Sequence, residues 1–165
     1  MGSNRGDRRA HLTRALREIS RLAPVIGVSS IYRTDPVGYA AQRPFWNAVA
    51  AILWRGSAER LLRAAQAIEK SIGRKPSFRN GPREIDLDVL DLGGRRRKFR
   101  DPILPHPRMA GRRFVLAPLA ELAPDWRHPE TGRTAADLLR ELPARPGATR
   151  LSSRPKGWPS RRPGS

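Results

Sequence analysis

The segment Arg79-Asn80-Gly81-Pro82-Arg83-Glu84-Ile85-Asp86-Leu87-Asp88-Val89-Leu90 joins a basic turn to an alternating pattern. From Ile85 onward, apolar and acidic side chains alternate, which is typical of an extended strand with two different faces. Asp86 and Asp88 therefore share one face. Because like charges at this spacing repel, the pair predicts a cation or a basic cluster beside it. Magnesium fits best, since one or two carboxylates completed by waters and substrate phosphates are its usual protein environment.

The approach to this pair is rich in positive charge. Gly81-Pro82-Arg83 supplies a bend and a guanidinium group that suits phosphate. The loop from Gly73 to Arg83 has the layout expected for a triphosphate held between metal and guanidinium groups, with Arg74, Lys75, Arg79 and Arg83. Two plainer interpretations stay open for these residues alone: an edge strand whose aspartates keep it soluble, and a disordered basic loop.

The same segment resembles the signature of the 6-hydroxymethyl-7,8-dihydropterin pyrophosphokinases, enzymes of the folate pathway that move a pyrophosphoryl group from ATP to a pterin alcohol. That signature reads basic-x-Gly-Pro-Arg-x-x-Asp-apolar-Asp-apolar-apolar, and every position of it is filled here. The resemblance extends from about Gly2 to Leu142, which predicts a pyrophosphokinase domain over residues 1–142. It departs from the family in the basic loop, which is about a residue short and carries Asn80 where some members have a tryptophan.

The resemblance implies a complete set of site residues, with ATP as co-substrate. Two Mg²⁺ ions are implied at Asp86 and Asp88. The groups that offset charge during catalysis, and that also bind the nucleotide, are implied to be Arg74, Arg83, His106 and Arg112, and the nucleotide site adds Gln66 and Glu69. The pterin site is implied at Thr34, Pro36, Val37, Gln42, Phe45, Asn47 and Phe114.

Such a pterin site makes chemical sense, because a flat heterocycle with donors and acceptors needs an amide, backbone groups and an aromatic ring on each face. Taken without the resemblance, several of these residues have ordinary interpretations. Asn47 is then a satisfied structural asparagine, Phe114 a core residue, and Gln66 and Glu69 a solvated helix edge.

Length and composition favour a single domain in the cytoplasm. The chain has 165 residues, enough for one substantial core. It has no cysteine, hence neither a disulfide framework nor a thiolate metal site. No apolar run of membrane length and no signal-peptide pattern occurs in the sequence. The protein is expected to be a monomer. The net charge of +18 attracts ATP, nucleic acid and anionic lipid alike, so charge alone does not choose a partner.

The spacing of apolar residues, together with capping, glycine and proline residues, predicts the following helices and strands. A helix begins after Asp7 and carries Leu12, Ala15, Leu16, Ile19 and Leu22. Strands are predicted at Val25–Tyr32, at Phe45–Trp54 and from Ile85, with a loop over 34–44. A helix over 58–72 follows Ser57 and ends at Gly73, and a last helix runs from the capping box at Thr134 to about Leu142. Residues 143–165 are expected to form a disordered basic tail.

This order fits an α+β fold, a ferredoxin-like α/β sandwich with a central, mostly antiparallel sheet, once a leading strand is supplied. Members of the family usually begin with an apolar strand, whereas only Met1 precedes Gly2 here. The leading strand is therefore expected to be missing. Two explanations are a start codon placed too late, which we favour, and a weakened paralogue.

Two rival functions remain open. The first is a basic α+β module that binds RNA, with Phe45, Trp46 and Trp54 as stacking platforms; it leaves the two aspartates unexplained. The second is a different magnesium-dependent phosphotransferase or nuclease that uses the same carboxylates. The chain has no Gly-x-x-x-x-Gly-Lys loop, so the motif of a P-loop enzyme is absent.

Overall fold

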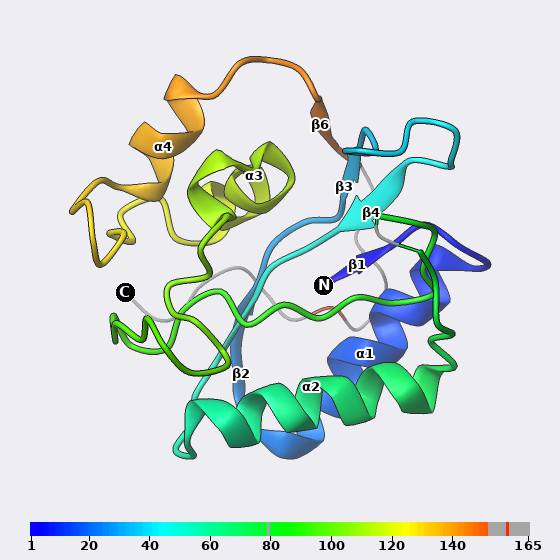
Figure 1. The fold of residues 1–165 in the computed structure, drawn as a ribbon, viewed down its shortest axis with the longest axis horizontal. Coiled ribbons are helices and arrows are strands. Elements are labelled where there is room, and N and C mark those ends of the chain that lie inside the picture. Colours follow the sequence, from blue (N-terminus) through cyan, green and yellow to red (C-terminus); the bar gives the residue numbers. More distant parts are fainter. Residues whose placement is uncertain (79, 152–157, 159–165) are drawn as a thin grey trace.

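The computed structural model describes residues 1–78, 80–151 and 158 and shows short strands combined with four α-helices (Figure 1). Four strands form an antiparallel sheet in the order β1 (Gly2–Ser3), β4 (Phe45–Asn47), β3 (Tyr32–Thr34) and β6 (Ala148–Arg150). A second sheet pairs β2 (Val25–Val28) with β5 (Ala50–Ile52). The predicted α+β class with a central antiparallel sheet is confirmed.

Three helices begin and end where the sequence predicted. The side chain of Asp7 accepts a hydrogen bond from the backbone of α1 (Arg8–Leu22), and Ser57 does the same for α2 (Ala58–Ile72). Gly73 ends α2 with a φ of 99°, a left-handed conformation that glycine adopts without strain. Thr134 caps α4 (Ala135–Glu141). Within the described residues, no helix has the length and apolar character needed to cross a bilayer.

A helix that the sequence interpretation missed, α3 (Arg113–Leu122), follows a short 3-10 turn at Met109–Gly111. Pro118 lies inside it, and a proline normally argues against a helix interior. The helix forms because apolar burial outweighs this cost, since most of its side chains are buried against α4 and the sheet.

Both long predicted strands are interrupted, which corrects the predictions for Val25–Tyr32 and Phe45–Trp54. The first divides into β2 and β3 at Ser29-Ser30, which are both buried. Ser30 donates from its backbone N and from its hydroxyl to the carboxylate of Glu121 on α3. The chain can therefore leave one sheet and enter the other without an unpaired polar group at the break.

The segment with the two aspartates is extended but is not a regular strand, which corrects the strand predicted from Ile85. Its ladder is reduced to one bridge, in which Gly2 and Asp86 exchange two backbone hydrogen bonds of 2.8 Å. The predicted alternation still holds, because Ile85 and Leu87 are buried whereas Asp88 is exposed.

Two cores lie on the two sides of the strands (Figure 1). The first core packs α1 and α2 against the strands and includes Leu12, Leu16, Ile31, Ile68 and Ile85. The second packs α3 and α4 and is centred on Met109 and Leu116, both of which are fully buried. Residues from both sides border the site described below.

The expectation of a disordered tail from Pro143 is wrong for Ala148–Arg150, because these residues form β6 against β3. Trp158 is also buried, and its indole donates to the carbonyl oxygen of Ser29 at 2.9 Å. The remaining tail residues, 152–157 and 159–165, lie outside the described part of the chain.

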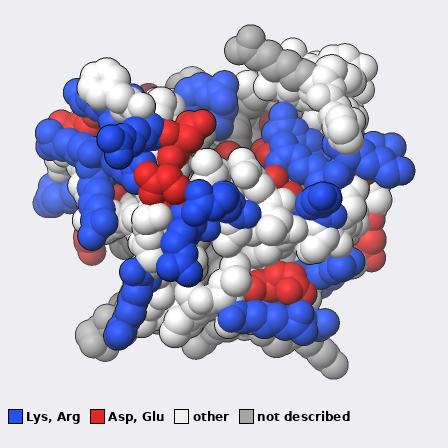
Figure 2. All heavy atoms as spheres, turned by 60° about the horizontal axis from the view of Figure 1, so that its bottom comes forward, with Lys and Arg blue, Asp and Glu red and all other residues white. Residues whose placement is uncertain are grey.

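Positive charge is distributed widely over the surface. On the face shown in Figure 2, lysine and arginine side chains are interspersed with neutral surface and with carboxylates. Some basic side chains of the protein are paired, as in the contacts of Arg21 with Glu18 and of Arg97 with Glu59. This face therefore carries a general positive potential and not one continuous basic stripe.

An apolar cavity of about 330 Å³ lies beside Met1, between β5 and residues 87–92. Met1 exchanges backbone hydrogen bonds with Ala48, so a residue placed ahead of Met1 would run beside Val49 and β5. Within the described residues, β5 pairs only with β2, on its other edge. A strand that preceded Met1 would fit this cavity.

We predict that fusing four strand-forming apolar residues ahead of Met1 stabilises the fold, because they would bury apolar surface and pair with the free edge of β5. Each gain of about 1 kcal/mol would raise Tm by roughly 2–4 °C, measured by calorimetry. An extension of four Gly and Ser residues is the control. Equal Tm values for the two extensions would contradict the prediction.

We predict that Glu121→Ala lowers the free energy of unfolding by about 1–3 kcal/mol, because the buried Ser30 loses the acceptor of two donors. Urea unfolding measures this loss. Glu121→Gln keeps one acceptor oxygen and serves as the matched control, with a smaller loss. An alanine variant as stable as the glutamine variant would show that this contact does not support the break.

Candidate functional site

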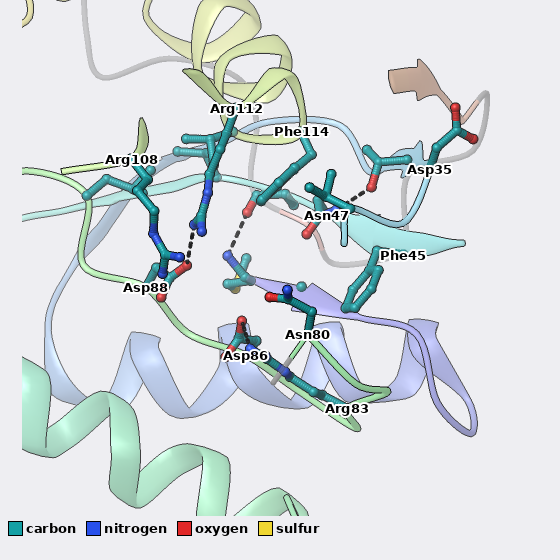
Figure 3. Close-up of a pocket in the computed structure, with 18 residues that line it drawn as sticks. Asp35, Phe45, Asn47, Asn80, Arg83, Asp86, Asp88, Arg108, Arg112 and Phe114 are labelled. Atoms are coloured by element: carbon teal, nitrogen blue, oxygen red, sulfur yellow. Dashed lines mark hydrogen bonds and ion pairs between the residues drawn. The ribbon is translucent and has the colours of Figure 1, made fainter. Parts of the chain in front are cut away.

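A cavity of about 180 Å³ lies where the first strand, the aspartate segment and the start of α3 meet (Figure 3). Nine of the predicted site residues line it: Thr34, Val37, Phe45, Asn47, Arg83, Asp86, Asp88, Arg112 and Phe114. They come from segments far apart in the chain. The fold therefore brings the predicted metal, nucleotide and pterin residues to one place, while the role of each stays a prediction.

Both aspartates face arginine side chains. Asp86 contacts Nη1 of Arg74 at 2.9 Å through one oxygen and Nη1 of Arg83 at 2.7 Å through the other. Asp88 lies 3.9 Å from Nη1 of Arg112. Their side chains are 25% and 40% exposed, so both carboxylates remain reachable from the cavity. The predicted basic cluster beside the acidic pair is thus present.

Glu69, on α2, supports the pairing of the aspartates with the arginines. It is almost fully buried on α2, accepts a hydrogen bond from the backbone N of Leu87 at 2.6 Å and pairs with Arg74. Burial raises the pKa of the Glu69 carboxyl, against the opposing effects of the Leu87 hydrogen bond and the Arg74 charge. Glu69 therefore fixes the backbone between the two aspartates and one of the arginines that face them.

Gln66, Glu69 and Arg74 do not line the main cavity. They border an adjacent open groove together with Lys75 and Arg83. Because Arg83 lines both spaces, the groove and the cavity meet at this side chain. Five of the six predicted nucleotide residues are thus divided between these two neighbouring spaces, and His106 lines neither.

The predicted pterin side is built around Asn47. Its Nδ2 donates to Oγ1 of Thr34 at 2.6 Å, which orients the amide. Gly2 allows the amide to approach the first strand, because a Cβ at that position would lie 2.4 Å from Oδ1 of Asn47. Phe45 and Phe114 lie on different sides of the cavity (Figure 3). The site therefore offers one fixed amide between two aromatic rings.

Two predicted pterin residues, Pro36 and Gln42, are not among the cavity lining. Gln42 instead ties two loops together, since its Nε2 donates to the carbonyl oxygen of Asn80 at 2.9 Å and its Oε1 accepts from the buried Asn4 at 2.8 Å. Asn4 in turn accepts from the backbone N of Arg83 at 2.8 Å. Gln42 thus acts here as a support for the cavity wall.

The basic loop also packs against the 34–44 loop. Asn80 adopts a φ of 60°, a left-handed conformation that asparagine tolerates better than most residues, and its side chain lies against Gly38. The rings of Tyr39 and Phe78 meet edge to face with centroids 5.1 Å apart. Asn80 lines the cavity at the place noted as a departure from the family, whereas Arg79 lies outside the described residues.

His106 is not among the residues that line the cavity. Burial lowers the pKa of its imidazole, as do the Arg112 and Arg108 guanidinium groups, whereas Asp88 raises it. The ring is therefore neutral at pH 7. The backbone N of Arg108 donates to Nδ1, which places the hydrogen of the neutral ring on Nε2. His106 can then donate one hydrogen bond from Nε2.

The sequence interpretation missed Arg108 and Asp35 as lining residues. Arg108 directly follows the Pro-His-Pro segment, so its place beside a predicted nucleotide residue was the available signal. Asp35 follows Thr34 in the predicted pterin loop, and its carboxylate accepts from the backbone N of Gly147 at 2.8 Å. Nothing local in the sequence pointed to that contact.

The donor set suits a metal that is shared with a substrate. Among the described residues, no group of three or more histidine, cysteine, aspartate or glutamate side chains is placed to hold an ion. Asp86 and Asp88 supply hard oxygen donors to one cavity. Such a pair fits Mg²⁺, which keeps several waters and takes phosphate oxygens as its other ligands.

Comparison with known proteins shows close relatives. The family model described as 7,8-dihydro-6-hydroxymethylpterin-pyrophosphokinase matches residues 1–124. The chain is 44% identical over 124 residues to the 2-amino-4-hydroxy-6-hydroxymethyldihydropteridine pyrophosphokinase of Bacillus subtilis, covering 74% of each chain. It is 41% identical over 145 residues to the protein of that name in Pseudomonas aeruginosa, covering 87% of this chain and 89% of the relative. The folic acid synthesis protein FOL1 of Dictyostelium discoideum is 33% identical over 142 residues, 86% of this chain but 22% of that protein.

We predict that His106 titrates below its ordinary value of 6.5, because burial and two arginines disfavour the charged ring. Its ring resonances in a pH series of NMR spectra give the midpoint. Asp88→Asn should lower this midpoint further, since it removes the charge that raises the pKa, and Arg108→Met should raise it. Shifts in the opposite directions would contradict the placement of His106 between these groups.

Proposed function

The chain belongs to the 7,8-dihydro-6-hydroxymethylpterin-pyrophosphokinase family, and we propose that it transfers pyrophosphate from ATP to the hydroxymethyl group of 6-hydroxymethyl-7,8-dihydropterin in the cavity bordered by Asp86 and Asp88. It is thus a transferase of folate biosynthesis. The observation that supports this site most directly is that one cavity is lined by the carboxylates of Asp86 and Asp88, by three arginines and by the amide of Asn47 between two aromatic rings.

The pterin binds in the part of the cavity around Asn47. Its ring lies between Phe45 and Phe114, because flat heterocycles pack favourably on aromatic faces. The amide of Asn47 is held by Thr34, so it meets the heteroatoms of the pterin edge in a fixed orientation. This end of the cavity also contains Val37, which adds apolar contact.

ATP binds across the groove of Gln66 and Arg74 and the acidic end of the cavity. Arg74, Arg83 and Arg112 bind phosphate oxygens, for which the planar guanidinium group provides paired donors. His106 donates from Nε2 to a further phosphate oxygen. Asp86 and Asp88 would hold Mg²⁺, which would supply charge neutralisation at the phosphates.

In the reaction, the pterin hydroxymethyl oxygen attacks the β-phosphorus of ATP, a bond forms between them, and the bond from that phosphorus to the α-phosphate oxygen breaks. AMP leaves and the hydroxyl proton passes to solvent. No side chain is assigned as general base, because transfers of this kind depend chiefly on positioning and on charge neutralisation. Removal of one well-placed donor typically costs about 2.7–4 kcal/mol of transition-state stabilisation.

We predict that Asp86→Asn and Asp88→Asn each abolish AMP formation from ATP and the pterin alcohol, because the amide cannot replace a charged oxygen donor to Mg²⁺. A coupled assay with and without magnesium measures AMP, and circular dichroism checks the fold. Glu18→Gln, which removes a carboxylate on the surface of α1, is the control and keeps wild-type turnover. Turnover in either aspartate variant would remove the metal role.

If wild type forms no AMP in this assay and instead binds RNA with steep salt dependence, the basic RNA-binding module replaces the enzyme as the function of the site.

A further inference from the structure

Every arginine that we assign to the phosphates of ATP contacts one of the two assigned metal ligands in this structure. Asp86 has one oxygen on Arg74 and the other on Arg83, at 2.9 and 2.7 Å. Asp88 faces Arg112 at 3.9 Å. Two of these contacts are visible along the acidic edge of the cavity in Figure 3, where Arg83 lies at Asp86 and Arg112 at Asp88. Both carboxylates are therefore engaged by the protein itself.

We propose that these guanidinium groups take the place of the divalent cation in the nucleotide-free protein and exchange partners when nucleotide and metal enter together. The arginines then pass from carboxylate to phosphate, and the carboxylates are released to the cation. This inference rests on the proposed function, because it takes from there the identity of the phosphate and metal ligands. It adds a coupling between metal binding and nucleotide binding that is built into the arginines.

The charges in the site explain why the exchange is favourable only when the metal and the nucleotide bind together. Asp86 and Asp88 repel one another, and the buried Glu69 adds a third carboxylate nearby, so these carboxylates need cations beside them. A free metal ion entering alone would displace Arg83 and leave its guanidinium group without an anion. A triphosphate supplies that anion, because guanidinium groups bind phosphate and carboxylate with the same geometry.

Arg83 is the side chain whose partner matters most for the exchange. Arg74 has a second partner in Glu69, so it keeps an anion when Asp86 is released. In the part of the chain that the structure describes, the guanidinium of Arg83 pairs with Asp86 alone. Its backbone is held separately, by Asn4, so a change of the side chain leaves the loop attached. Removing this guanidinium therefore frees one oxygen of Asp86 without loosening the cavity wall.

The test is binding of Mn²⁺ to the protein in the absence of nucleotide, followed by electron paramagnetic resonance, since free and bound Mn²⁺ give different signals. Arg83→Met should bind Mn²⁺ more tightly than wild type, by a factor within the range of about 5–150 found for coupled sites. Arg108→Met is the charge-matched control: Arg108 lines the same cavity but contacts neither aspartate in an ion pair. It should change the affinity less than threefold.

A second pair of variants shows where the ion binds. Adding Asp86→Asn to Arg83→Met should return Mn²⁺ affinity to the wild-type value or below. Circular dichroism confirms that each variant is folded. Equal Mn²⁺ affinity in wild type and Arg83→Met, or an equal gain in Arg108→Met, would overturn the inference. Because no nucleotide or pterin is present, this outcome is separate from failure of the proposed function, which the AMP assay reports.

Discussion

The buried carboxylate of Glu69 holds the site together. A charge at 7% exposure is costly unless it is paired and hydrogen-bonded, and Glu69 is both. Its oxygen accepts from the backbone of Leu87, between the two aspartates, and its charge pairs with Arg74 in the loop that follows α2. One side chain thus sets the position of the acidic segment relative to the helix and to the basic loop. The contact of Arg74 with Asp86 depends on this relation.

A second buried polar side chain, that of Asn4, positions the cavity wall formed by the basic loop and the 34–44 loop. Asn4, at 1% exposure, joins the first loop of the chain to Gln42 and to the backbone of Arg83. The basic loop and the 34–44 loop therefore have a common anchor, and the packing of Asn80 on Gly38 joins them again further out. Gln42 was predicted to contact the pterin directly; in this structure it shapes the wall, and any ligand contact remains a prediction.

Local signals in the sequence were sufficient to predict α1, α2 and α4. Each of these helices begins at a cap residue whose side chain accepts a hydrogen bond from a backbone N–H of the first turn. Local signals failed for α3, where Pro118 stands within a segment that is buried on most sides and so lacks a clear polar face. They also failed at Ser29-Ser30, because the break between β2 and β3 depends on Glu121, 91 residues away. No local pattern encodes a partner at that distance.

The residues of the site also divide into those that the local sequence predicted and those that depend on distant partners. The motif around Asp86 and the resemblance it carries named nine residues that line one cavity. The pairing of each aspartate with a particular arginine had no such signal, because it depends on how separate loops pack. The contacts that support the site were thus harder to predict than the residues that line it.

The anchoring of Trp158 on Ser29 has a consequence for how the protein is made. The two residues are 129 positions apart, so at about 5–20 residues per second the ribosome reaches Trp158 roughly 6–26 s after Ser29. Throughout that interval, Val28 and Ile31 lack the indole that completes their core. The pace of translation between these two positions therefore sets how long this incomplete core is exposed to other nascent chains.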